Sequence, residues 1–94
     1  MKIAKLGVVG AGQMGNGIAH VAAASGLSVT MRDLDDRLVS RGLDTIAKNL
    51  QRGVDKGKMT ASDKDAVLGR IAGTTDLSDL AGCDLVVEAA VESL

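Results

Sequence analysis

Three glycines near the amino terminus have the spacing of a phosphate-binding turn. Gly10, Gly12 and Gly15 form the pattern G-x-G-x-x-G between an apolar stretch, residues 5–9, and an amphipathic stretch, residues 13–25. The first glycine permits a tight turn, the second lets a pyrophosphate approach the backbone, and the third lets a helix pack close to a sheet. Free N–H groups of the first helical turn would face the phosphate, and the helix dipole would favour its charge. The pattern predicts a dinucleotide site formed by Gly10, Ala11, Gly12, Gln13, Met14 and Gly15.

An acidic residue follows at the distance that such a site requires. Residues 27–31 have the composition of a second strand, and Asp33 lies about 20 residues beyond the glycines, where a carboxylate accepts hydrogen bonds from the adenosine ribose. Its negative charge would repel a 2′-phosphate, so we expect the cofactor to be NAD. Arg32 and Arg37 are close enough in sequence to keep NADP as an alternative.

Composition limits the other functions. The chain has 94 residues, which is one small domain, and its 11 basic and 12 acidic residues form no block of one sign. We therefore expect no nucleic-acid partner and no binding to an anionic membrane. No apolar run approaches the length of a membrane span and no signal peptide is expected, so the expected location is cytoplasmic. Cys83 is the only cysteine, has no metal-site partners, and is interpreted as a packing residue.

Two residue classes are missing. The chain has no proline and no aromatic residue, whereas average composition would give roughly 5 prolines in this length. We infer a sequence that was engineered with a reduced alphabet or reconstructed. Without an aromatic ring to stack on adenine or nicotinamide, affinity would depend on backbone donors, Asp33 and aliphatic walls.

The remaining elements follow from hydrophobic periodicity and capping signals. A long helix is predicted from Asp35–Asp36 to about Lys56 with Gly57 ending it, and a capping box at residues 60–63 opens a second helix that runs to Arg70. Residues 70–74 form a short strand, and Thr75 or Asp76 caps a short helix that Gly82 ends. The apolar run at residues 84–88 is typical of a strand buried on both faces.

This order predicts an α/β fold of the Rossmann type. Right-handed crossovers favour three layers around a parallel sheet of about four strands in the order 3-2-1-4, with a helical hairpin between strands 2 and 3. The ligand crevice of such a sheet opens at the carboxyl ends of strands 1 and 4. We therefore expect residues 89–92 to face the cofactor across from the glycine turn. Residues 1–94 would form a dinucleotide-binding half-domain with no second domain.

Three blocks of the sequence resemble a known family. The blocks are residues 10–19, residues 49–60 with Lys-Gly-Lys-Met-Thr, and residues 74–76 followed by 84–89. Together they resemble the amino-terminal part of the 3-hydroxyacyl-CoA dehydrogenases, the bacterial 3-hydroxybutyryl-CoA dehydrogenases in particular, over essentially all 94 residues. The resemblance implies an oxidoreductase domain that carries NAD, in enzymes of fatty acid metabolism that transfer hydride to or from carbon 3 of a CoA thioester.

The resemblance also implies residue roles. Gly10 to Gly15 would bind the pyrophosphate, Asp33 the ribose, and Ala89 and Glu92 would line the cofactor channel. The family's helical hairpin touches CoA, and the matching positions are Asn49, where relatives often have serine, and Lys56. For Lys56 an equally good interpretation is a solvated cation at a helix end.

Catalysis is not expected from this chain alone. In the family a histidine–glutamate pair, a serine and an asparagine act further along the chain, and the one histidine here, His20, lies within the first helix and is interpreted as structural. We expect dinucleotide binding without turnover. The alternatives are a dehydrogenase completed by dimerisation or by a further domain, and a simplified fold with negligible binding. We also expect self-association, including a dimer, through the open edge of residues 84–88.

Overall fold

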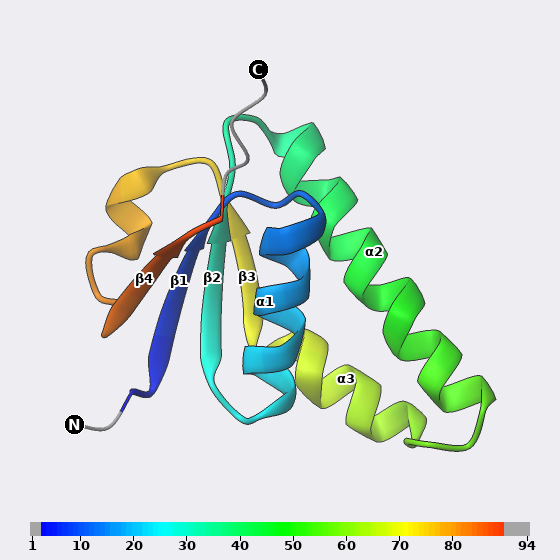
Figure 1. Ribbon diagram of the computed structural model, residues 1–94. Helices are drawn as coiled ribbons and strands as arrows, with labels where there is room; N and C mark the ends of the chain where they lie inside the picture. Colours follow the sequence, from blue (N-terminus) through cyan, green and yellow to red (C-terminus); the bar gives the residue numbers. More distant parts are fainter. Residues whose placement is uncertain (1–2, 90–94) are drawn as a thin grey trace.

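A four-stranded parallel sheet in the order β3-β2-β1-β4 organises residues 3–89, the part of the chain that this computed structural model describes (Figure 1). The predicted α/β class and strand order are confirmed. The strands are β1 (Lys5–Val9), β2 (Ser28–Arg32), β3 (Ile71–Thr74) and β4 (Leu85–Glu88). The helices are α1 (Gln13–Ala24), α2 (Asp36–Asp55), α3 (Ala61–Gly69) and the short η1 (Leu77–Leu80).

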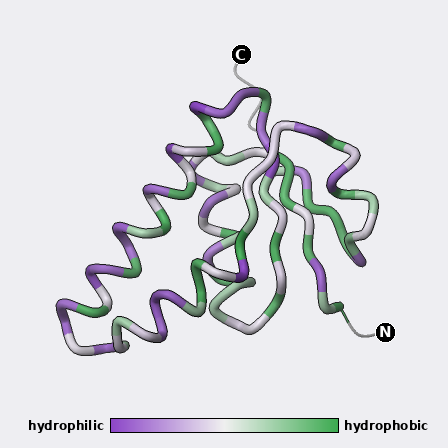
Figure 2. The backbone as a smooth tube through the Cα atoms, turned by 180° about the vertical axis from the view of Figure 1, so that it is seen from behind, coloured by the Kyte–Doolittle hydropathy of each residue, from purple (hydrophilic) through white to green (hydrophobic). Residues whose placement is uncertain are grey.

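The core lies between the sheet and the three α-helices. Leu6 and Val8 of β1 pair in register with Val29 and Met31 of β2, and all four side chains are buried. Ile46 of α2 is fully buried in the same cluster. Figure 2 shows this distribution, with hydrophobic residues concentrated along the strands and hydrophilic residues recurring along the hairpin of α2 and α3. The apolar core therefore lies on the face of the sheet that the α-helices cover.

Part of the opposite face of the sheet is covered by η1. Successive strand residues point to opposite faces, so Gly7 faces away from the α-helices, and a Cβ placed there would meet Leu80 of η1 at 3.0 Å. Leu80 is buried as a result. The predicted short helix is thus a 3₁₀ turn, which Asp76 caps by accepting from the Ser78 N–H at 2.9 Å.

The hairpin signals in the sequence are confirmed. Asp35 caps α2 by accepting from the Leu38 N–H, and α2 ends just before Gly57, whose φ is +72°. Thr60 and Asp63 form the reciprocal capping box that opens α3. The turns of the hairpin therefore have the local chemistry that the sequence indicates.

The prediction that residues 84–88 are buried on both faces is wrong for this chain. Leu85 and Val86 of β4 are each 46% exposed, and Val87 is half-buried. The reason is that β4 is an edge strand, with β1 on one side and no strand of residues 3–89 on the other. Its apolar composition therefore lies largely open to solvent. Strand β2 also starts at Ser28 rather than Leu27, a shift of one residue.

No helix within residues 3–89 is long and apolar enough to cross a membrane.

Candidate functional site

The glycine turn joins β1 to α1 at the carboxyl edge of the sheet (Figure 1). Gly10 has a φ of +112°, which L-residues with a side chain rarely adopt, and its N–H donates to the Arg32 carbonyl at 2.7 Å. A Cβ on Gly15 would overlap the carbonyl group of Gly10. The turn and the first turn of α1 are therefore packed backbone against backbone, and only glycine fits at the contact.

The amino terminus of α1 offers uncapped N–H groups. Gly12 occupies the N-cap position and provides no side-chain hydrogen bond, and α1 has no acid in its first turn. By contrast, Asp35 caps α2 and Thr60 caps α3. The first amides of a helix have no intrahelical acceptor, so those of α1 are left for an external anion. A Cβ on Gly12 would meet nothing within 4 Å, and open space therefore lies beside this backbone.

Asp33 lies against this turn. Its Oδ2 accepts a hydrogen bond from the Ala11 N–H at 2.7 Å, and its Oδ1 accepts from the Leu34 N–H at 2.7 Å. The half-buried carboxylate therefore ties the end of β2 to the glycine turn. A carboxylate has about four acceptor positions, so each oxygen can still accept a ribose hydroxyl.

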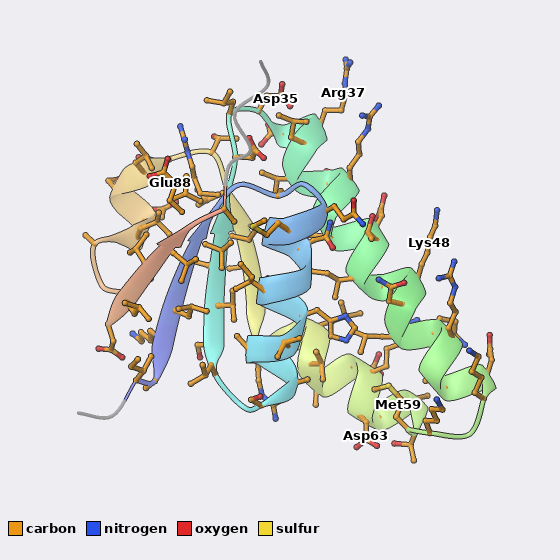
Figure 3. The ribbon with its side chains drawn as sticks, viewed as in Figure 1. Asp35, Arg37, Lys48, Met59, Asp63 and Glu88 are labelled. Atoms are coloured by element: carbon orange, nitrogen blue, oxygen red, sulfur yellow. The ribbon has the colours of Figure 1, made fainter. Side chains whose placement is uncertain are left out.

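The two arginines considered for a 2′-phosphate are placed differently. Arg32 alternates with buried Met31 along β2, so it points to the face covered by η1, where its Nε donates to the Thr75 carbonyl at 3.0 Å. There the Ser78 N–H lowers the pKa of Asp76 most, and the charge of Arg32 adds to the effect. Arg37 lies in the first turn of α2 and points away from the sheet (Figure 3).

Asn16 is a site residue to which sequence reasoning assigned no role. It is 8% exposed and is the only buried polar or charged residue within residues 3–89. Its Nδ2 donates to the Gly12 carbonyl at 2.7 Å and contacts the Ala11 carbonyl at 3.4 Å. One signal in the sequence could have indicated this role: Asn16 is a polar residue directly after the third glycine, on the side of α1 that faces the core.

The carboxyl end of β4 closes the other side of the turn. The Ala89 N–H donates to the Val9 carbonyl at 2.8 Å, and Ala89 is 5% exposed. Ala89 therefore lies directly beside the start of the glycine turn, on the side opposite β2. Glu92, the other residue expected here, lies outside the described residues.

Gln13 and Met14 point outward from the first turn of α1. Both are exposed, Met14 by 58%, and they border an open groove of about 540 Å³. The groove continues along the outer face of α1 over Gly17, Ile18, Val21 and Ala22. It is an apolar helix face rather than the crevice at the carboxyl ends of the strands.

The remaining candidates lie away from the turn. Asn49 and Lys56 are exposed in the carboxyl-terminal half of α2 and at its end. This end of α2 lies far from the glycine turn (Figure 1). The Asn49 Oδ1 accepts from the Arg52 guanidinium at 3.3 Å. His20 is half-buried in α1, beyond its first turn. Within residues 3–89, no three His, Cys, Asp or Glu side chains gather as a metal site.

Comparison with known proteins gives a consistent result. The family model described as "3-hydroxyacyl-CoA dehydrogenase, NAD binding domain" matches residues 5–94. A probable 3-hydroxybutyryl-CoA dehydrogenase of Deinococcus radiodurans is 54% identical over 89 residues, which is 95% of this chain and 32% of that protein. The 3-hydroxyadipyl-CoA dehydrogenase of Escherichia coli is 39% identical over 94 residues, which is all of this chain and 20% of that protein.

One solved structure is similar to this chain over nearly its whole length. The (S)-3-hydroxybutyryl-CoA dehydrogenase of Ralstonia eutropha superimposes with a TM-score of 0.95 at 46% identity, covering 99% of this chain and 33% of that one. The chain thus spans about a third of the length of the 3-hydroxybutyryl-CoA dehydrogenases it matches.

Proposed function

Since the chain belongs to the 3-hydroxyacyl-CoA dehydrogenase family and its residues 5–94 match the family's NAD-binding domain, we propose that it binds NAD at the glycine turn and, by itself, turns over no substrate. The observation that carries this proposal is the uncapped amino terminus of α1 beside Asp33. The pyrophosphate would accept from the amides of residues 12–15, and Asp33 would accept from the ribose. Bound NAD would supply the hydride acceptor, and these residues would hold and orient it.

NAD is favoured over NADP by the charges around the turn. The Asp33 carboxylate lies at the ribose position, where it would repel a 2′-phosphate. Arg32 is engaged on the other face of the sheet, and Arg37 points outward (Figure 3). Neither cation therefore neutralises a 2′-phosphate beside Asp33.

Calorimetric titration of the 94-residue chain with NAD and with NADP tests binding and selectivity together. The expected result is a measurable affinity for NAD, with NADP weaker by at least about tenfold because one charge repulsion is unrelieved. Absence of NAD binding would contradict the binding proposal and favour the interpretation as a simplified fold. Equal or tighter NADP binding would contradict the selectivity alone.

Turnover is tested in the same samples. With acetoacetyl-CoA and NADH, we expect no protein-dependent loss of NADH absorbance, because reduction of the 3-oxo group needs a substrate held against the nicotinamide and a proton donor within hydrogen-bond reach of its oxygen. His20, the chain's one histidine, is in α1 beyond its first turn. Turnover that rises with protein concentration would instead support a dehydrogenase completed by dimerisation.

We also propose Asn49 and Lys56 as contacts to CoA in proteins that contain this domain. The support is the resemblance of the hairpin and the exposure of both side chains on α2. The alternative for Lys56 is a solvated cation that interacts with the helix dipole, since it is the C-cap of α2. A titration with CoA in the same calorimetric series separates the two, because only a contact produces heat that is lost in Lys56→Ala.

Self-association through β4 is the last part of the proposal. The support is the open edge of β4 together with its exposed apolar residues Leu85 and Val86. An antiparallel pairing of β4 with its twin would join two sheets across a two-fold axis.

A further inference from the structure

Asn16 has the one buried polar side chain of residues 3–89, and this side chain donates its hydrogen bonds to the glycine turn. Asn16 follows the third glycine, lies in α1 and is 8% exposed. The helix itself does not require a carboxamide at this position. A buried amide without partners would destabilise the fold, so its hydrogen bonds indicate what it contributes. Both of its acceptors are carbonyls of the turn, Gly12 at 2.7 Å and Ala11 at 3.4 Å.

These two contacts favour one orientation of the turn's amides. No peptide bond within residues 3–89 is cis, and in a trans peptide the N–H points opposite to the carbonyl that precedes it. Holding the Ala11 carbonyl inward therefore turns the Gly12 N–H outward. Holding the Gly12 carbonyl along α1 in the same way turns the Gln13 N–H toward the open end of the helix.

Two further hydrogen bonds restrain the same turn. The Ala11 N–H donates to Asp33, and the Gly12 carbonyl also accepts from the Asn16 backbone N–H at 2.8 Å. Asp33 and Asn16 thus hold the donor and the acceptor ends of the Ala11–Gly12 segment. Gly12 itself, having no side chain, can rotate more freely than any other residue type, so the segment needs such restraints.

We propose that Asn16 is a positioning residue for the dinucleotide: its carboxamide orients the Gly12 and Gln13 amides toward the pyrophosphate before the ligand arrives. The inference rests on the proposed NAD site and adds a residue that contacts the turn rather than the ligand. Orientation in advance strengthens binding because the ligand need not order the donors itself.

The test compares ligands with and without a pyrophosphate. In Asn16→Ala, the affinities for NAD and ADP-ribose should fall by about tenfold, the effect of roughly one lost hydrogen bond and a less ordered turn. Adenosine, followed by NMR chemical shifts because it binds weakly, should change by less than about twofold, since it lacks the group that meets the turn. Asn16→Ser should keep most of the NAD affinity, because a hydroxyl can donate to the carbonyl four residues earlier.

Ser25→Ala is the matched control. It removes a side-chain hydrogen bond to a backbone carbonyl, that of Val21 at 2.9 Å, from the opposite end of the same helix. NAD affinity should not change in this variant. If Asn16→Ala does not fold, Asn16→Ser against Ser25→Ala carries the comparison, with a small selective loss expected for the pyrophosphate ligands.

The outcomes separate the two proposals. Unchanged NAD affinity in Asn16→Ala, or equal losses for adenosine and ADP-ribose, overturns the role of Asn16 while NAD binding by the unmodified chain stands. No NAD binding by the unmodified chain overturns the proposed site, and the role of Asn16 with it.

Discussion

A single carboxylate connects β2 to the glycine turn, and it gives the sharpest prediction at the scale of one residue. Asp33 accepts from Ala11 and from Leu34, one hydrogen bond on each oxygen. In Asp33→Asn, one of these oxygens becomes an NH₂ group that can only donate, so one N–H loses its acceptor. We expect NAD affinity, measured by calorimetry, to fall by about tenfold, because the turn loses one hydrogen bond and the ribose loses a charged acceptor.

The same substitution should also reduce the preference for NAD over NADP, because the charge that repels a 2′-phosphate is gone. Asp44→Asn is the control, since it removes the same charge from an exposed position on α2. The ribose contact would be refuted if Asp33→Asn bound NAD as tightly as this control.

Sequence reasoning identified Asp33 from its distance to the glycines but not its bond to Ala11, and it assigned no role to Asn16. The reason is physical. Spacing along the chain gives the element on which a residue lies, whereas the direction of a carboxamide or carboxylate depends on how the turn packs against α1 and β2. Gly42 is a similar case: its place in the apolar pattern of α2 is visible, but not that a Cβ there would lie 2.7 Å from the Ala11 carbonyl oxygen.

At the scale of the elements, one carboxylate connects the residue before β4 to the start of β1. The Asp84 Oδ2, just before β4, accepts from the N–H groups of Ala4 and Lys5 at 2.8 and 2.9 Å, next to β1. These two hydrogen bonds, that from Ala4 first, hold the pKa of Asp84 below its usual range. A lowered pKa in the folded state means that the carboxylate stabilises the fold above its ordinary pKa of about 3.9, and that this contribution is lost as the pH falls through the lowered value.

We therefore expect Asp84→Asn to lower the urea midpoint at neutral pH, and the difference from the unmodified chain to shrink as the pH falls below about 4. The comparison between variants is needed because Asp63 and Asp76 also have lowered pKa values, Asp63 through hydrogen bonds from Thr60 and Asp76 through hydrogen bonds from Ser78. Their shared contribution cancels in the difference. A difference that stays constant down to about pH 2 would contradict the assignment to Asp84.

The elements were largely predictable where the signal is local. Thr60 with Asp63, Asp35 and Gly57 mark helix ends through bonds to their own neighbours, and the structure has those ends. The exposure of β4 was not predictable in this way. An apolar run such as residues 85–87 indicates a buried strand only if other elements cover it, and that depends on the whole assembly rather than on the run itself.

At the scale of the whole molecule, large apolar side chains are exposed on several elements, Leu34 after β2 and Leu77 of η1 among them, and two of these surfaces could pair with another copy. One is β4, with Leu85 and Val86 each 46% exposed, and the other is the groove face of α1, where Val21 is 66% exposed. Within residues 3–89 both outer strands of the sheet, β3 and β4, have an open edge, but only β4 combines that edge with large exposed apolar side chains. Apolar side chains can pack on many surfaces, but an open edge specifically favours pairing with another strand.

We therefore expect two chains to pair through β4, giving one sheet of twice four strands and a mass in light scattering near twice 9.6 kDa at high concentration. Val86→Lys should shift the mass to that of a monomer, because the two-fold axis would bring the new charges close together across the antiparallel edge. Val21→Lys is the matched control, because Val21 is also an exposed valine, 66% against 46% for Val86, and lies away from the edge. If the control dissociates the pair and Val86→Lys does not, the copies meet through the face of α1; a monomeric mass for the unmodified chain would remove the pairing altogether.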